Sequence, residues 1–201
     1  MTASPDFMQQ ALAQAARALY SSNPNPRVGC VIVAPDGHTV LGQGHTQPVG
    51  GPHAEVMALR DAAALGNDVR GATAYVTLEP CAHQGRTGPC CDALVAAGIG
   101  RVVAALEDPN PLVAGQGFAR LRAAGVDVEV GAGANEAREL NIGFLSRMVR
   151  KTPWVRMKAA ASLDGTTALA NGESQWITSP EARADGHAWR ARACAVLTGI
   201  G

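Results

Sequence analysis

Apolar residues recur along this chain with helical spacing in some segments and in short β-rich runs in others. Residues 6–20 carry apolar side chains every three or four positions, which predicts an amphipathic helix that the NPNP segment ends. Residues 27–44 contain two β-rich runs around Asp36-Gly37, a dipeptide typical of hairpin turns. A second helix is predicted over residues 52–65, with Gly66 as its C-terminal glycine.

Strands and helices alternate after this hairpin. The β-rich runs lie at residues 72–78, 101–106 and 126–130, and the helical segments at residues 90–98, 117–125 and 135–149. This alternation predicts an α/β fold, a three-layer αβα domain with a mostly parallel sheet.

A domain boundary is predicted where charged residues and a proline interrupt this pattern, near residues 147–154. The first domain then covers residues 1–147 and the second covers residues 148–201. The second contains two predicted strands, 154–162 and 194–201, and one helix, 181–193. A unit of this size buries little core alone, so we expect it to be incomplete.

Composition limits the classes of partner and the compartment. The 201 residues include 17 Lys and Arg and 17 Asp and Glu, which argues against a nucleic-acid partner. The sequence has no apolar run of the ~20 residues that cross a bilayer, and its start does not resemble a secretory signal. The five cysteines, with Cys90 and Cys91 adjacent, do not suggest a disulfide framework. We therefore expect a cytoplasmic protein without a membrane partner, in which grouped cysteines serve a metal or catalysis.

Two short segments together predict a zinc site. GGPHAEVMALR contains His53 and Glu55, and TLEPCAHQGRTGPCC contains Cys81 and Cys90. One imidazole and two thiolates are ligands suited to zinc, and an open fourth position is typical of catalytic zinc. H-x-E followed by P-C and a later Cys is the zinc-deaminase signature, in which the Glu moves protons. Eight residues separate the cysteines here, where that signature has two, so the match is imperfect.

Local sequence supports this assignment. Pro52 directly precedes His53, and Pro89 directly precedes Cys90. Proline suits the first turn of a helix, so both ligands are expected at helix N-termini. The helix dipole stabilises a thiolate at such a position. Two alternatives stay open. The metal could serve only folding, in a non-catalytic module, or these side chains could be unrelated buried and exposed residues.

The chain resembles the bifunctional riboflavin-biosynthesis deaminase/reductase family. The similarity is carried by NPNPRVGCVIV, HAEVMALR, TLEPCAHQGRTGPCCDAL and EDPNPLVAGQG, and in the second domain by ASLDGTTAL and GESQWIT. It implies a cytoplasmic enzyme with one zinc ion per deaminase domain and a phosphorylated small-molecule pyrimidine substrate. It also implies NADPH for a reductase domain that resembles dihydrofolate reductase, and assembly into a homo-oligomer.

The resemblance assigns roles to residues of the first domain. His53, Cys81 and Cys90 are the implied zinc ligands, and Glu55 is the implied catalytic proton shuttle. The implied pyrimidine and phosphate contacts are Asn25, His45, His83, Arg86, Asp108 and Asn110. His83 and Arg86 also place donors beside the zinc loop, where a 5′-phosphate could be held. Asp108 and Asn110 follow a buried strand, at the usual ligand edge of an open α/β sheet.

In the second domain the resemblance implies NADP contacts at Ala160 and Trp176 and reductase-substrate contacts at Ser174 and Arg190. Most of the reductase fold is expected after Gly201, so we expect this chain to deaminate but not to reduce. Other zinc deaminase substrates, namely cytosine, cytidine or tRNA adenosine, are the nearest alternatives. The tRNA substrate is disfavoured by the zero net charge and the 4% aromatic content.

Overall fold

The structure is a computed structural model that describes residues 6–83, 88–110 and 114–199. Contacts within the chain divide it into two units, Met1–Pro153 and Trp154–Gly201. The predicted boundary after residue 147 lies a few residues before this division. The helices of the described residues include none that is long and apolar enough to cross a membrane.

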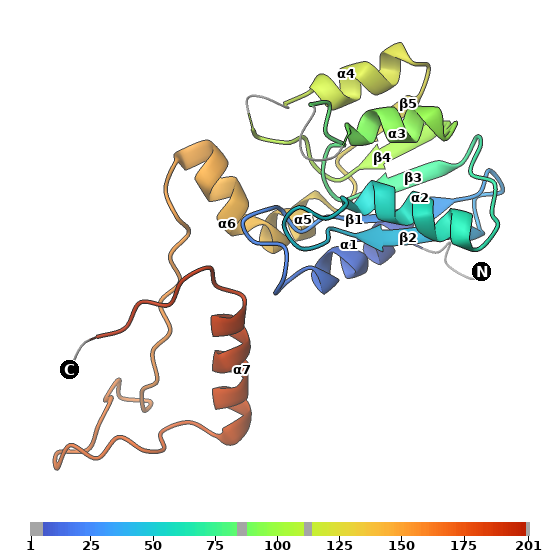
Figure 1. Ribbon diagram of the computed structural model, residues 1–201. Coiled ribbons are helices and arrows are strands. Elements are labelled where there is room, and N and C mark those ends of the chain that lie inside the picture. The colour runs from blue at the N-terminus through green and yellow to red at the C-terminus, as the bar shows by residue number, and fades with distance from the viewer. Residues whose placement is uncertain (1–5, 84–87, 111–113, 200–201) are drawn as a thin grey trace. The chain divides into compact units, whose positions relative to one another are not determined.

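The first unit is built on a mixed sheet with the strand order β2-β1-β3-β4-β5 (Figure 1). β1 (Gly29–Val33) pairs antiparallel with β2 (Val40–His45), which confirms the predicted hairpin, and antiparallel with β3 (Thr73–Val76). β4 (Arg101–Ala104) pairs parallel with β3 and with β5 (Asp127–Val130). Within the described chain, β1 therefore runs against the other strands of the sheet, which share one direction.

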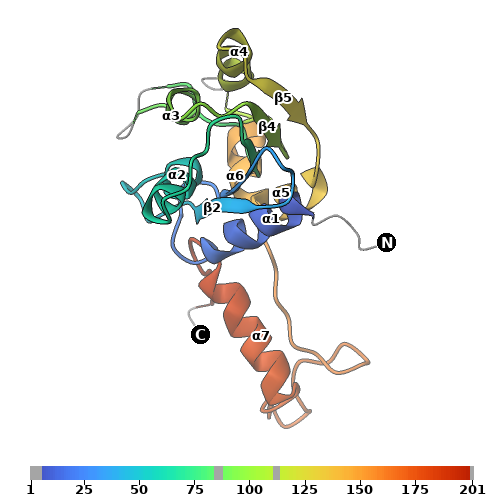
Figure 2. The same cartoon turned by 90° about the vertical axis from the view of Figure 1, so that its right-hand side faces the viewer.

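Helices cover both faces of this sheet, as predicted. α1 (Phe7–Arg17) and α5 (Ala134–Leu140) lie on one face, and α2 (Ala54–Ala64) and α3 (Cys90–Ala96) lie on the other (Figures 1 and 2). α4 (Gln116–Ala123) packs beside α3.

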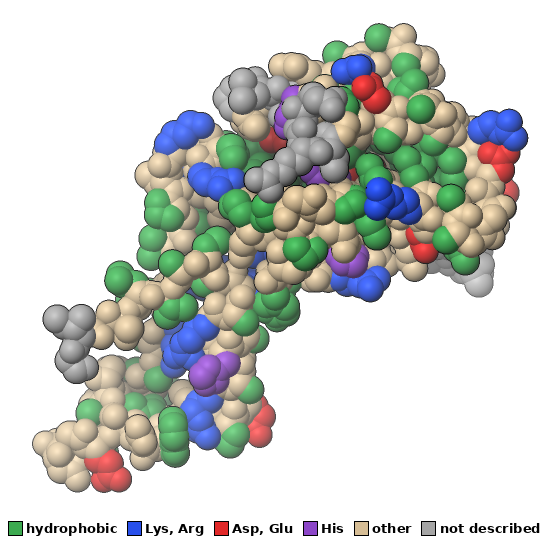
Figure 3. Space-filling view, viewed as in Figure 1, with side chains coloured by type: hydrophobic (Ala, Val, Ile, Leu, Met, Phe, Trp, Pro, Cys, Tyr) green, Lys and Arg blue, Asp and Glu red, His purple; other side chains and the backbone are tan. Residues whose placement is uncertain are grey.

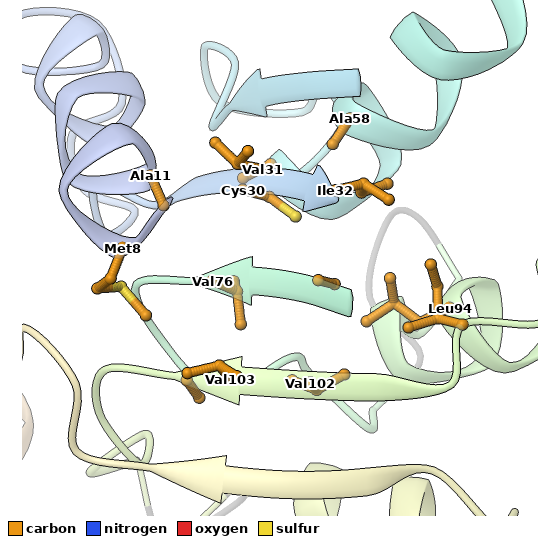
Figure 4. Close-up of a cluster of buried hydrophobic side chains, with 14 of the residues drawn as sticks. Met8, Ala11, Cys30, Val31, Ile32, Ala58, Val76, Leu94, Val102 and Val103 are labelled. Atoms are coloured by element: carbon orange, nitrogen blue, oxygen red, sulfur yellow. The ribbon is translucent and has the colours of Figure 1, made fainter. Parts of the chain in front are cut away.

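The core lies between these layers. Ala11 of α1 approaches β1 from one side and Ala58 of α2 from the other, around the buried Val31 and Ile32 (Figure 4). Period-2 alternation along β1 sends its apolar side chains into both halves of this core.

Glycines bring α2 unusually close to β2. A Cβ atom at Gly44 would lie 2.5 Å from the backbone nitrogen of Ala58, and one at Gly42 would lie 2.4 Å from the carbonyl oxygen of Ala58. No ordinary side chain fits these distances. Glycines on β2 therefore allow α2, the helix that carries Glu55, to pack closely against this strand.

The helix predicted over residues 135–149 is interrupted. It consists of α5, then α6 (Ile142–Leu145), then a π-helix, η1 (Ser146–Arg150). Asn141, 1% exposed, lies at the break, where its side chain accepts a hydrogen bond from the Arg27 backbone nitrogen at 2.7 Å and donates to the Arg27 carbonyl oxygen at 2.9 Å. This contact with a segment 114 residues earlier accompanies the loss of regular helix.

In the described part of the second unit, residues 154–199, α7 (Pro180–Ala191) is the regular element. Ser179 caps it by accepting a hydrogen bond from the Ala182 backbone nitrogen. The strands predicted over residues 154–162 and 194–201 do not form among these residues, so that prediction is wrong for them. Strands need neighbours to satisfy their backbone groups, and large apolar side chains such as Met157 and Leu197 stay exposed.

Candidate active site

Three potential metal ligands meet at the N-terminal ends of two helices. His53 is the N-cap residue of α2, Cys90 is the first residue of α3, and Cys81 lies on the loop before α3. His53 Nδ1 lies 3.3 Å from Cys90 Sγ and 3.7 Å from Cys81 Sγ. Tetrahedral zinc with ordinary bond lengths would separate nitrogen and sulfur ligands by roughly 3.6 Å. The donor atoms of the three side chains all lie within 4.8 Å of one another, so they fit a zinc ion.

The two sulfurs are electrostatically coupled. The Cys90 backbone nitrogen donates to Cys81 Sγ at 3.4 Å. Hydrogen bonds from Cys90 lower the pKa of Cys81, while the same pairing and burial raise the pKa of Cys90. A zinc ion bound here would stabilise both sulfurs as thiolates, and the N-terminus of α3 favours a thiolate at Cys90 as well.

Glu55 lies beside these ligands, one residue into α2, and is 3% exposed. Burial, and after it the Cys81 charge, raise the pKa of its carboxyl group to about 7. A carboxyl group with such a pKa can both accept and release a proton near neutral pH, which is what a proton shuttle needs.

A cavity of about 240 Å³ opens in front of this cluster. It brings together His53, Glu55 and Cys81 with four of the residues that the resemblance assigns to the substrate. These four are Asn25, His83, Asp108 and Asn110. Burial raises the pKa of Asp108, and the nearby Glu79 charge adds to this.

Two predicted contacts stand apart from this group. His45, at the end of β2, is half-buried and is not among the residues that line the cavity. Arg86 lies outside the described residues. The assignments of both to the substrate stay predictions, as do the individual roles of the other residues.

Several lining residues were missed by sequence reasoning, and the most informative is Glu79. Its carboxylate, 4% exposed, accepts hydrogen bonds from four backbone nitrogens at 2.8–3.3 Å. They belong to Asp108, Gly115, Gly117 and Phe118. Glu79 therefore caps the start of α4 and fixes the loop that carries Asp108. The sequence feature that could have indicated its role is its position in TLEPC, two residues before the predicted zinc ligand Cys81.

We predict that Glu79→Gln lowers the free energy of unfolding by about 2 kcal/mol or more, because an amide NH₂ would face backbone N–H donors and leave them unsatisfied. Urea unfolding of the zinc-loaded protein measures this. Glu107→Gln, an exposed position on the same loop, is the matched control and should change stability little. Equal stability of the wild type and Glu79→Gln would contradict the capping role.

The second unit has a cavity of its own, of about 210 Å³. All four residues that the resemblance assigns to the reductase, Ala160, Ser174, Trp176 and Arg190, line it. Lys158, Arg183 and His187 line it as well, which gives the cavity a basic character suited to an anionic ligand.

Comparison with known families divides the chain in the same way. Residues 1–106 match the family described as the cytidine and deoxycytidylate deaminase zinc-binding region. Residues 153–201 match the RibD C-terminal domain.

Individual relatives resemble nearly the whole chain. The riboflavin biosynthesis protein RibD of Escherichia coli (strain K12) is 57% identical over 192 residues, 96% of this chain and 51% of that protein. The structure of Acinetobacter baumannii RibD, form 1, is 55% identical with a TM-score of 0.83, covering 92% of this chain and 51% of that one.

A third relative is a diaminohydroxyphosphoribosylaminopyrimidine deaminase/5-amino-6-(5-phosphoribosylamino)uracil reductase from Thermotoga maritima. It is 42% identical, with a TM-score of 0.86, and the match covers 92% of this chain and 52% of that one. The chain thus spans about half the length of the curated relatives it matches.

Proposed function

Because the chain belongs to the cytidine and deoxycytidylate deaminase zinc-binding family, we propose that its first unit deaminates a phosphorylated pyrimidine in riboflavin biosynthesis. The proposed substrate is 2,5-diamino-6-(5-phosphoribosylamino)pyrimidin-4(3H)-one, in keeping with the activity named for the Thermotoga maritima relative. The observation that carries the proposal is the meeting of His53, Cys81 and Cys90 with a buried Glu55 at one cavity.

The side chains suit hydrolytic deamination. His53, Cys81 and Cys90 would hold the zinc ion, which would supply the Lewis acidity that activates water for attack on an amidine-like ring carbon. Glu55 accepts a proton from the attacking water and passes it to the ring nitrogen, and then moves the proton of the new hydroxyl group on the ring carbon to the departing amine. The carbon–nitrogen bond breaks, a carbonyl group forms and ammonia leaves.

Two alternatives are less well supported. A tRNA substrate calls for a basic surface, but Lys and Arg side chains are dispersed among polar and acidic ones on the face of the first unit seen in Figure 3. A purely structural zinc site normally has a fourth protein ligand, and the cluster found among the described residues has three. A cytoplasmic location and a homo-oligomer stay predictions.

For the second unit we propose a part of an NADPH-dependent reductase, supported by the cavity that joins Ala160, Ser174, Trp176 and Arg190. Among the described residues of this unit, 154–199, the predicted strands are not formed. The expectation from the sequence, that this chain deaminates but does not reduce, stays a prediction. NADPH-dependent turnover of the deaminated product by the purified 201-residue protein would contradict it.

The experiment that tests the deaminase combines zinc stoichiometry with ammonia release. The zinc-loaded protein should release ammonia from the phosphorylated diaminopyrimidinone and little from cytidine or cytosine. Preference for cytidine would assign it to another substrate class. Bound zinc without ammonia release from any of the three compounds would favour the non-catalytic module.

A further inference from the structure

Part of the active-site cavity comes from a segment that neither family match includes. Phe144, Arg147 and Met148 line the cavity from α6 and η1. The zinc-binding deaminase match ends at residue 106, and the RibD C-terminal match begins at residue 153. The zinc ligands and Glu55 lie within the first match. The side of the cavity formed by α6 and η1 therefore lies outside the segment that carries the zinc-binding residues.

We propose that Arg147 binds the phosphate group of the substrate and makes the site selective for a phosphate monoester. The inference rests on the proposed function, since it concerns the ligand of the same cavity. It adds Arg147 to His83, which also lines the cavity and which the sequence suggested for the phosphate.

The charge of the cavity supports this role. Glu55, Glu79 and Asp108 line it, whereas Arg147 is its one permanently charged cation among the described lining residues. A phosphate dianion that enters this site is repelled by any of these carboxyl groups that is ionised, unless a cation compensates. A guanidinium group can do so through two parallel hydrogen bonds to phosphate oxygens, as well as by its charge.

Arg147 is also held in place before a ligand arrives. Its Nη2 donates to the carbonyl oxygen of Pro24 at 3.0 Å, and its guanidinium carbon lies 5.7 Å from the centre of the Phe144 ring. A guanidinium group has five N–H donors, so the bond to Pro24 leaves donors for an anion. Pro24 directly precedes Asn25, another lining residue, so Arg147 is tied to the loop that contributes to the same cavity.

The buried Asn141 side chain strengthens this connection. It bonds both backbone groups of Arg27 and also donates to the Ala137 carbonyl oxygen at 3.2 Å. α5 and the loop before β1 are therefore fastened together on the N-terminal side of Arg147. An anchored guanidinium group loses less conformational entropy on binding than a freely rotating one.

The test compares two substrates across four proteins. The phosphorylated diaminopyrimidinone and its dephosphorylated form are given to the zinc-loaded wild type, Arg147→Gln, Arg147→Lys and Arg150→Gln. Arg150 is the matched control, an exposed arginine of η1 that does not line the cavity.

Arg147→Gln should lower kcat/KM for the phosphorylated compound by about 10- to 100-fold and change it less than about twofold for the other. Arg147→Lys should lie between, because it keeps the charge without the planar fork. Arg150→Gln should match the wild type. Equal losses on both compounds, no loss on the phosphorylated one, or an equal effect of Arg150→Gln would overturn the proposal.

A binding measurement separates this proposal from the proposed function. If the wild type deaminates neither compound, the proposed function fails, but calorimetric binding of ribose 5-phosphate against ribose still tests Arg147. The wild type should prefer the phosphate ester, and Arg147→Gln should lose that preference. Preference lost in Arg190→Gln but kept in Arg147→Gln would place phosphate binding in the second unit and refute the inference.

Discussion

Replacing Glu55 by glutamine is expected to lower kcat for deamination by about 10²- to 10⁴-fold while the zinc content stays at the wild-type level. Glutamine has nearly the shape of glutamate but cannot accept the proton of the attacking water. Glu55 is not among the three clustered ligands, so the metal should remain bound. Ammonia release and zinc analysis on the same preparation measure both effects.

Glu136→Gln is the matched control for this change. Glu136 lies on the exposed first turn of α5 and should behave as the wild type in both measurements. Activity retained in Glu55→Gln would remove the proton shuttle from the proposal. Loss of zinc together with activity would instead show that Glu55 acts through the metal site.

Replacing Cys81 by alanine is expected to remove both zinc and activity. The variant loses one of three clustered ligands and also the sulfur that accepts a hydrogen bond from the Cys90 backbone nitrogen. We expect zinc affinity to fall at least about 100-fold, beyond the 10- to 100-fold typical of changes around a metal's ligands. Competition with a chromogenic chelator gives the affinity, and thermal unfolding with and without zinc gives the linked stability.

Cys91→Ala provides the comparison for this variant. Cys91 is buried next to Cys90 but does not belong to the metal cluster. Its replacement should cost some packing energy and leave zinc affinity within a fewfold of the wild type. Comparable zinc loss in both variants would mean that the effect arises from disturbed packing rather than from a missing ligand.

The zinc ligands could be predicted from the sequence because short local motifs determine where they lie. Pro52 and Pro89 mark helix starts, and the structure places His53 at the N-cap of α2 and Cys90 at the first residue of α3. The hairpin around Asp36 was equally local. Its carboxylate accepts hydrogen bonds from the backbone nitrogens of His38 and Thr39, which fix the turn.

Features that depend on distant residues were not readable in this way. The interruption at Asn141 accompanies contacts with Arg27, and Arg147 looked like a charged linker residue until the structure placed it on the cavity. Helical periodicity reports only which face of a segment is apolar. It gives no information about a side chain that bonds a loop more than a hundred positions away.

In the second unit, the sequence predicted strands that the structure does not contain among the described residues. The runs 154–162 and 194–201 have the composition of strands, yet the described residues in them form no ladder. α7 forms because its hydrogen bonds are internal and Ser179 caps it. A strand's hydrogen bonds lie outside the segment, so composition alone does not determine whether it forms.

The close seating of α2 on β2 has a consequence for random mutagenesis. Any side chain larger than hydrogen at Gly42 or Gly44 must push α2 outward, and His53 and Glu55 would travel with it. A shift of about 1 Å is enough to impair catalysis severely. Screens for inactive variants should therefore recover substitutions at these two glycines, which have no reactive group themselves.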